Sequence, residues 1–122
     1  MFSTRRVAVV VDDRAAAEML HTFFRLMELE CALISHGSEA VPTLRRFAPD
    51  ILILDLDLPD LRALDLAFEI RAVLPTLPII FLSQSPDAAA PFDAPVVAMP
   101  ARGRFEEMLR LFEVVLELDR GG

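Results

Sequence analysis

The segment ILILDLDLPD, residues 51–60, places the strongest constraint on the fold. Its first four residues are all Ile or Leu, which is typical of a parallel strand buried on both faces. Asp55, Asp57 and Asp60 follow within the same segment. Two carboxylates about 4 Å apart repel each other by roughly 4 kcal/mol at an effective dielectric constant of 20. Acids clustered at the end of a buried strand therefore need either a cation or separate access to water.

The composition indicates one compact domain over residues 1–122. The chain is 54% hydrophobic and 25% charged, which is typical of a globular protein with one core. Its net charge of −7 argues against direct binding to nucleic acid or to an anionic membrane, because such binding needs clustered Lys and Arg. Cys31 is the single cysteine, so no internal disulfide can form and a reducing cytoplasm is expected. The chain has no run of about 20 apolar residues, so no membrane span is expected.

The rest of the chain repeats the strand-then-helix order. RVAVVV at residues 6–11 and IIFLS at residues 79–83 resemble the buried strand at 51–54, and helical apolar spacing follows the first of them. Alternating strands and helices with short connections predict a doubly wound α/β fold with right-handed crossovers. The predicted strands cover residues 6–11, 31–35, 51–54, 79–83 and 96–99, and the predicted helices cover residues 14–28, 40–47, 64–74 and 102–118.

Three local features refine this pattern. Ser38 is expected to cap the second helix. Residues 84–95 hold three prolines, so at most one short helical turn fits where another full helix would stand. The last helix has a wide apolar face, which either covers the sheet or mediates a homodimer or partner contact. That face is predicted to comprise Phe105, Met108, Leu109, Phe112, Val115 and Leu116.

Five side chains should meet at the carboxyl ends of the strands, where ligands bind in open parallel sheets. They are Asp12, Asp13, Asp55, Ser83 and Met99. Grouped carboxylate oxygens suit Mg²⁺, which takes one or two carboxylates and keeps several waters. A bound cation would neutralise the repulsion between the acids, and it would position a phosphoryl group next to a carboxylate nucleophile.

Simpler roles exist for each of these acids. Asp12 or Asp13 could cap the first helix and interact with its dipole. Asp55 could be a solvated loop acid, although its placement together with Asp12 and Asp13 at strand ends argues against this. Asp57 and Asp60 are expected to be loop residues whose carboxylates face water, with the backbone carbonyl of Asp57 as the atom of interest.

The motifs together resemble the receiver domains of two-component response regulators. The matching segments are VVVDD at 9–13, ILILDLDLPD at 51–60, IIFLS at 79–83 and the Met99-Pro100 dipeptide. The resemblance implies a flavodoxin-like five-stranded parallel sheet of order 2-1-3-4-5 flanked by helices. It also implies a cytoplasmic signalling domain that accepts a phosphoryl group from a histidine kinase or phosphotransfer protein and acts on a downstream protein.

The resemblance also implies a role for each site residue. Asp55 would be the phosphoacceptor, and Ser83 would contact the phosphoryl group through its hydroxyl. Mg²⁺ would be bound directly by Asp13 and Asp55, through water by Asp12, and by the main-chain carbonyl of Asp57. Such a domain is not an enzyme in the usual sense, although it could catalyse its own phosphoryl transfer.

The sequence departs from the family at the switch positions. Met99 stands where the family has a Lys that pairs with the phosphoryl group, and a thioether cannot replace that charge. Val96 stands where the family has a mobile aromatic ring, and Ala63 replaces a glycine. The fourth helix is shortened or missing. Signalling is therefore expected to be atypical or weakened.

Two alternatives to a phosphorylated receiver remain. The first is a pseudo-receiver, which is a protein-interaction module that works without phosphorylation. The second is a haloacid-dehalogenase-type phosphatase, suggested by the spacing of Asp55 and Asp57. The phosphatase is disfavoured because in that family the paired aspartates follow the first strand and the mechanism needs a Lys, whereas all 12 basic residues here are Arg.

Overall fold

The computed structural model describes residues 4–58, 63–85, 87, 89–99 and 105–119. Five parallel strands form one sheet in the order β2-β1-β3-β4-β5. This order confirms the predicted doubly wound topology. The strands are β1 (Arg6–Val10), β2 (Glu30–Ile34), β3 (Ile51–Asp55), β4 (Ile79–Ser83) and β5 (Val96–Ala98).

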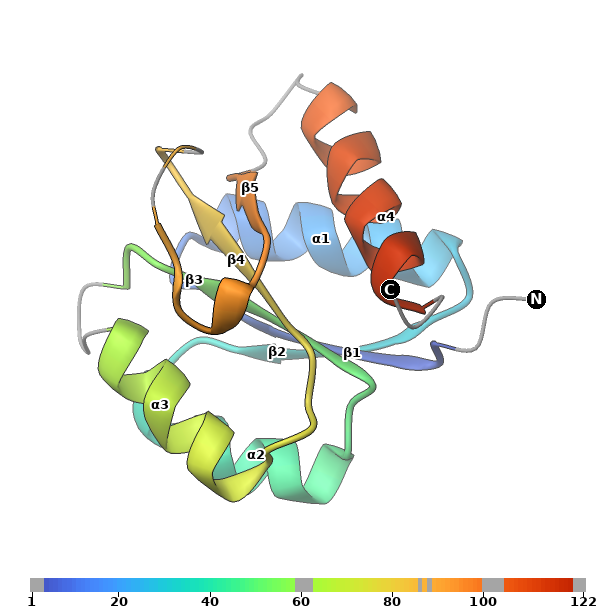
Figure 1. Ribbon diagram of the computed structural model, residues 1–122. Helices are drawn as coiled ribbons and strands as arrows, with labels where there is room; N and C mark the ends of the chain where they lie inside the picture. Colours follow the sequence, from blue (N-terminus) through green and yellow to red (C-terminus); the bar gives the residue numbers. More distant parts are fainter. Residues whose placement is uncertain (1–3, 59–62, 86, 88, 100–104, 120–122) are drawn as a thin grey trace.

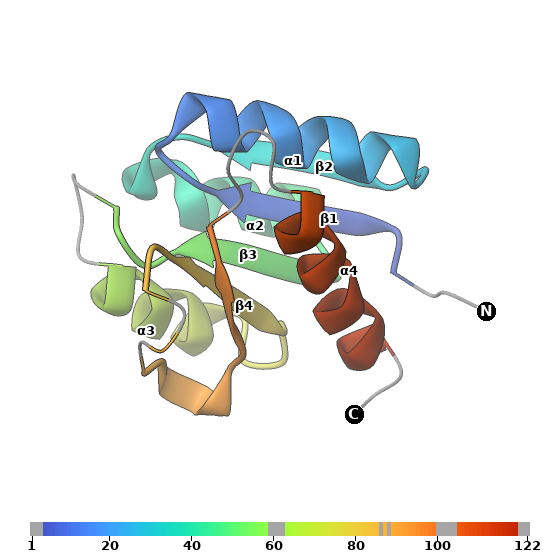
Figure 2. The same ribbon diagram turned by 90° about the horizontal axis from the view of Figure 1, so that it is seen from above.

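Four α-helices of the described chain cover the two faces of the sheet (Figures 1 and 2). Helices α1 (Arg14–Leu26) and α4 (Phe105–Asp119) pack on one face. Helices α2 (Ala40–Phe47) and α3 (Ala63–Val73) pack on the other face. The sheet is thus enclosed between two apolar layers, and the edge formed by the strand ends is left for polar groups.

Strand β3 shows why the apolar run at residues 51–54 must be central. Ile51 and Ile53 belong to the cluster beneath α1 and α4, while Leu52 and Leu54 belong to the cluster beneath α2 and α3. Because side chains alternate between the faces of a strand, a continuous apolar run is needed when both faces are covered. Burying each such side chain contributes about 1.5–3 kcal/mol.

The start of α2 differs from the prediction. Residues Gly37–Glu39 form a 3₁₀ turn, and Glu39 precedes α2 without a capping hydrogen bond from its side chain. The amide of Ala40 donates to the carbonyl of Gly37, so the tighter turn itself satisfies a backbone donor at the helix start. The prediction that Ser38 caps this helix is therefore wrong, because Ser38 is the middle residue of the turn and Glu39 occupies the N-cap position.

The segment between β4 and β5 confirms the shortened fourth helix. Among its described residues the one helical element is the 3₁₀ turn η2 (Pro91–Asp93). The ring of Phe92 packs edge-on against Phe68 of α3, with the centroids 5.1 Å apart. A single turn anchored by one aromatic ring thus stands beside β5 where a full helix would otherwise be expected.

Helix α4 buries a different set of side chains from the predicted one. Met108, Leu111, Val114 and Val115 are buried against the sheet, whereas Leu109 is 45% exposed. Only part of the predicted apolar face therefore covers the sheet, because the helix is rotated so that positions 108, 111 and 115 face inward and Leu109 does not. The predicted residues 102–104 and the side chain of Phe105 lie outside the described part of the chain.

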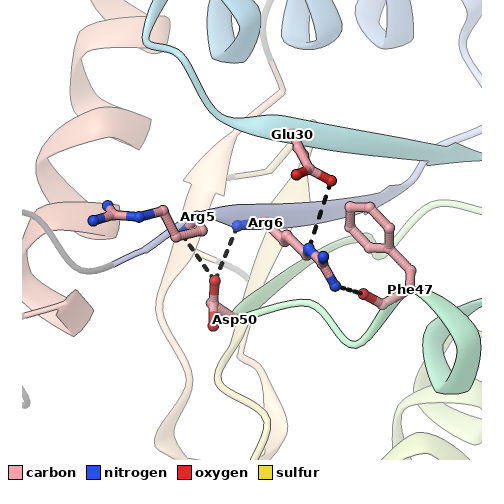
Figure 3. Close-up of polar contacts among 5 residues, drawn as sticks. All are labelled: Arg5, Arg6, Glu30, Phe47 and Asp50. Carbon is pink, nitrogen blue, oxygen red and sulfur yellow. Dashed lines mark hydrogen bonds and ion pairs between the residues drawn. The ribbon is translucent and has the colours of Figure 1, made fainter.

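The amino ends of three neighbouring strands are joined by polar contacts (Figure 3). The amides of Arg5 and Arg6 both donate to Oδ2 of Asp50, at 2.8 and 2.9 Å. The guanidinium of Arg6 donates to the carbonyl of Phe47 at 2.9 Å and lies 3.5 Å from a carboxylate oxygen of Glu30. We call these five residues the amino-edge cluster; it links β1 to β2 and to the loop before β3.

No helix within the described ranges combines the length and the apolar character that crossing a membrane requires.

Candidate functional site at the carboxyl ends of the strands

Asp55 is the last residue of β3 and the most deeply placed acid of the site. Only 4% of its surface is exposed, and the four residues before it on the strand are buried and apolar. Its Oδ1 accepts a hydrogen bond of 2.8 Å from the amide of Asp57, and the backbone amide of Asp12 also stabilises the carboxylate. The interpretation of Asp55 as a solvated loop acid is therefore wrong.

The surroundings of Asp55 disfavour its negative charge. Burial raises the pKa of Asp55 above its usual value, and the nearby charges of Asp57 and Asp12 raise it further. The backbone hydrogen bonds from Asp57 and Asp12 lower the pKa and offset part of this effect. Negative charge is thus concentrated around a buried carboxylate, which is the electrostatic condition that attracts a cation or an electrophile.

Asp13 caps α1, as one of the two interpretations of the Asp12-Asp13 pair predicted. Its Oδ1 accepts a hydrogen bond of 3.0 Å from the amide of Ala16, and its backbone is extended, as an N-cap residue requires. The cap uses one carboxylate oxygen, and the other oxygen has its own acceptor sites. Capping therefore fixes the position of Asp13 at the end of β1 and is compatible with binding a cation.

Asp57 connects the loops that follow β3 and β4, and Ser83 stabilises the second of these loops. Oδ2 of Asp57 accepts a hydrogen bond of 3.0 Å from the amide of Gln84. Ser83 is 3% exposed, and its Oγ accepts a hydrogen bond of 3.0 Å from the amide of Ser85. Asp57 is thus more than the plain loop acid that was expected, since its carboxylate ties two neighbouring loops together. The sequence carried no signal for this contact, because Gln84 lies 27 positions away.

Met99 lies directly after β5 and belongs to the core. It is 8% exposed and packs in the same cluster as Val11 and Met108, while its amide donates to the carbonyl of Ser83 at 3.0 Å. Val96, by contrast, is partly buried against the cluster on the other face of the sheet. The thioether at position 99 therefore contributes packing at this edge, but no positive charge.

The described residues fit Mg²⁺ as a partly hydrated ion. Within the described ranges no group of three or more Asp, Glu, His or Cys side chains is placed so that it could hold a metal ion by itself. Mg²⁺ does not need such a group, because it usually keeps several waters and takes one or two carboxylates. The repulsion that Asp12 and Asp57 exert on Asp55 is the feature that a divalent cation would relieve. Asp60 and Pro100 lie outside the described residues.

Comparison with curated proteins finds response regulators. The DNA-binding response regulator MtrA of Mycolicibacterium smegmatis is 36% identical over 83 residues, which make up 68% of this chain and 36% of that protein. The transcriptional regulatory protein TcrX of Mycobacterium tuberculosis is 35% identical over 77 residues, which make up 63% of this chain and 33% of that protein. The matched segment therefore spans about a third of the length of these relatives.

Comparison with solved structures finds the same fold. A response regulator of Chloroflexus aurantiacus superposes with a TM-score of 0.74 at 27% identity, covering 93% of this chain and 98% of that one. The response regulator TrrA of Thermotoga maritima, solved in complex with Mg²⁺ and beryllium fluoride, superposes with a TM-score of 0.73 at 23% identity, covering 92% and 99% of the two chains. The model of the response regulator receiver domain matches residues 7–99, more than half of the sequence. The chain therefore belongs to the receiver domains of two-component response regulators.

Proposed function

We propose that this receiver domain accepts a phosphoryl group on Asp55 from a histidine kinase or phosphotransfer protein, and that it does so with Mg²⁺. The observation that carries the proposal is the buried carboxylate of Asp55 at the end of β3, surrounded by the charges of Asp12 and Asp57. A structural acid would gain nothing from such a position, since both burial and its neighbours destabilise its ionised form.

In the proposed transfer, a carboxylate oxygen of Asp55 attacks phosphorus while the bond from phosphorus to the donor nitrogen breaks, which gives an acyl phosphate. The amides of Asp57 and Asp12 hold the carboxylate in place through their hydrogen bonds. Asp13 and the backbone carbonyl of Asp57 would hold Mg²⁺ together with Asp55, and Asp12 would do so through water. When bound, Mg²⁺ supplies positive charge to the phosphoryl oxygens. The Oγ of Ser83 would donate its proton to the phosphoryl group while its lone pairs still accept from the amide of Ser85.

We propose that Met99 makes the reaction slow and strongly dependent on Mg²⁺. The buried thioether places no charge beside the phosphoryl group, so neutralisation falls mainly on the cation. The partially buried Val96 has no ring that could move between buried and exposed positions, so the phosphorylated state must be reported by another element. The domain would therefore act as an atypical receiver that signals to a downstream protein.

The downstream partner is proposed to be a protein rather than DNA. MtrA is named as a DNA-binding regulator, but the matched part of it is about a third of its length. The net charge of −7 of the present chain opposes direct contact with phosphate groups.

The test is intact-protein mass spectrometry after incubation with acetyl phosphate and Mg²⁺. The parent protein is expected to gain one phosphoryl group, and Asp55→Asn is expected to gain none. Asp57→Asn is the matched control, because it removes a neighbouring carboxylate while keeping the backbone carbonyl and an oxygen that can accept from Gln84. This control is expected to be modified.

The pseudo-receiver is the second candidate, and the observation that favours it is the burial of Met99 in the apolar core. It would replace the first proposal if the parent protein gained no phosphoryl group and also failed to bind beryllofluoride. Modification of Asp55→Asn to the same extent as the parent would instead show that a different residue is the acceptor.

A further inference from the structure

Three large apolar side chains are exposed together on the surface formed by α3 and η2. Leu64 is 39% exposed, Phe68 is 57% exposed and Phe92 is 38% exposed. Leu64 and Phe68 are one helical turn apart on α3, and the rings of Phe68 and Phe92 meet at an interplanar angle of 70°. Both views show η2, drawn in orange between β4 and β5, beside α3 (Figures 1 and 2). We call these three residues the α3-η2 patch.

The patch is held in place by specific contacts. The guanidinium of Arg71 lies 4.7 Å from the centre of the Phe92 ring, which is within the range of a cation–π interaction. The same guanidinium donates to the carbonyls of Pro75 and Leu77, at 2.9 and 2.8 Å. Arg71 is therefore anchored near the end of α3, where its guanidinium stacks on the ring of Phe92.

The backbone of η2 is also unusual. Phe92 and Asp93 both have positive φ angles, 64° and 53°, which are uncommon for residues other than glycine. A bulky residue in this region is strained unless surrounding contacts offset the strain. Despite this strain, the ring of Phe92 remains more than one-third exposed, so core burial alone does not explain its position.

The charges beside the patch are acidic. Glu69 follows Phe68 on α3 and Asp93 follows Phe92 on η2, and both side chains are exposed. Among the described residues beside the patch the cation is Arg71, which contacts the Phe92 ring and donates to two carbonyls. The whole chain carries a net charge of −7, so a second copy docked here would bring like charges together.

We propose that the α3-η2 patch is a docking surface for a basic amphipathic helix of a partner protein. Its leucine and two phenylalanines would contact the apolar face of that helix, and Glu69 and Asp93 would face its Lys or Arg side chains. Clustered exposed apolar groups with a charged rim are typical of such interaction sites. Leu64, Phe68 and Phe92 are not residues of the site at the carboxyl ends of the strands, so docking can be tested without a phosphoryl donor.

The test uses two fluorescein-labelled helical peptides of about 18 residues, long enough to form several helical turns. Both carry leucines along one face; one has lysines on the other face, and the second has glutamates at the same positions. Fluorescence anisotropy with the full chain measures the Kd of each peptide, in the absence of any phosphoryl donor. Amide chemical-shift changes in NMR spectra then show where the peptide binds.

The lysine peptide is expected to bind at least tenfold more tightly than the glutamate peptide. Phe68→Ala and Phe92→Gly are each expected to weaken binding by about tenfold, which is typical of a central aromatic contact. Glycine at position 92 removes the ring but tolerates the positive φ, so the substitution adds no backbone strain to η2. Leu26→Ala is the matched control on α1, where the side chain is 80% exposed, and it should leave the Kd unchanged.

Four results would overturn the proposal. The first is no binding of the lysine peptide, and the second is equal binding of the two peptides. The third is a set of chemical-shift changes that maps to α1 or α4 instead of α3 and η2. A concentration-dependent dimer that is lost in Phe68→Ala would assign the patch to self-association and would also contradict it. None of these results bears on phosphorylation of Asp55, which the mass measurement tests separately.

Discussion

The charged groups at the two ends of the strands are arranged in opposite ways: they are paired at the amino ends and repel one another at the carboxyl ends. At the amino ends, Asp50 accepts from the amides of Arg5 and Arg6, and Arg6 lies beside Glu30 (Figure 3). Donors and acceptors are matched there, at the water-exposed surface. At the carboxyl ends, the buried Asp55 is surrounded by the charges of other acids. One sheet therefore supports an edge that stabilises the strand register and an edge that keeps a buried carboxylate at a cost in stability.

This difference shows how a stable core can support an unfavourable site. The strands that carry Asp55 and Ser83 are buried along their whole length, so the sheet positions both side chains whether or not their environment is favourable. Residues held in unfavourable environments persist only where the surrounding structure fixes them, and they are typical of functional sites.

The largest expected effect comes from adding a positive charge to the carboxyl edge. Met99→Lys is expected to increase the rate of phosphorylation by acetyl phosphate by about tenfold or more, because an ammonium group on a flexible stem can reach the acidic edge. The rate is measured by intact-protein mass spectrometry over time at fixed Mg²⁺. The lysine should also make the rate less dependent on the Mg²⁺ concentration.

Met99→Leu is the matched control for this substitution. It conserves the apolar volume of a residue that is 8% exposed, so it should leave the rate unchanged and cost less than about 1.5 kcal/mol. An equal rate increase in both variants would mean that packing, rather than charge, limits the reaction.

A smaller effect is expected from breaking the amino-edge cluster. Asp50→Ala removes the acceptor of two exposed backbone amides and is expected to lower the free energy of unfolding by about 1 kcal/mol, as measured by urea denaturation. Asp50→Asn keeps a side-chain oxygen in the same position and should lose less than half as much. If the two variants were equally destabilised, the charge of Asp50 rather than its hydrogen bonds would be the stabilising factor.

The smallest effect is expected at the rim of the same cluster. Glu30→Gln removes an ion pair whose nitrogen and oxygen atoms are 3.5 Å apart and whose side chains are 45% and 68% exposed. Such pairs contribute roughly 0–1 kcal/mol and are screened by salt. The variant should therefore change the free energy of unfolding by a few tenths of a kcal/mol at low salt. At 1 M NaCl a difference that persisted undiminished would show that the contact is not electrostatic.

Most of the fold could be predicted from the sequence because the strands follow simple physical rules. Continuous apolar runs such as those at residues 51–54 and 79–83 had to be central strands, and parallel order then placed Asp55 and Ser83 at one edge. Composition and proline content likewise predicted the shortened segment before β5. These features depend on local sequence and on general topology alone.

What could not be predicted depends on contacts between distant residues. The bond from the amide of Gln84 to Asp57 joins two loops whose approach is set by the whole sheet. The pairing of Phe92 with Phe68 needs a positive φ angle that no residue type at that position signals. The exposure of Leu109 depends on how α4 rotates against the sheet, which the apolar pattern of a wide helix face does not determine.

The most direct test of the contrast between the edges is the thermal stability of Asp55→Asn. The pKa of Asp55 is 3.8 in the unfolded chain and is raised in the folded state. At a pH between these two pKa values, the folded state binds more protons than the unfolded state. Stability therefore falls as the pH rises through this window, and the penalty is complete above it. The neutral amide of the Asp55→Asn variant would carry no such penalty, and below pH 3.8 the difference from the parent should disappear.

The measurement is the Tm of the parent and of Asp55→Asn at pH 7, first with a chelator and then with Mg²⁺. We expect a higher Tm for Asp55→Asn in the chelator, and we expect Mg²⁺ to raise the Tm of the parent more than that of the variant. A lower Tm for Asp55→Asn in the chelator, together with no response of the parent to Mg²⁺, would contradict the proposed cost of the buried carboxylate.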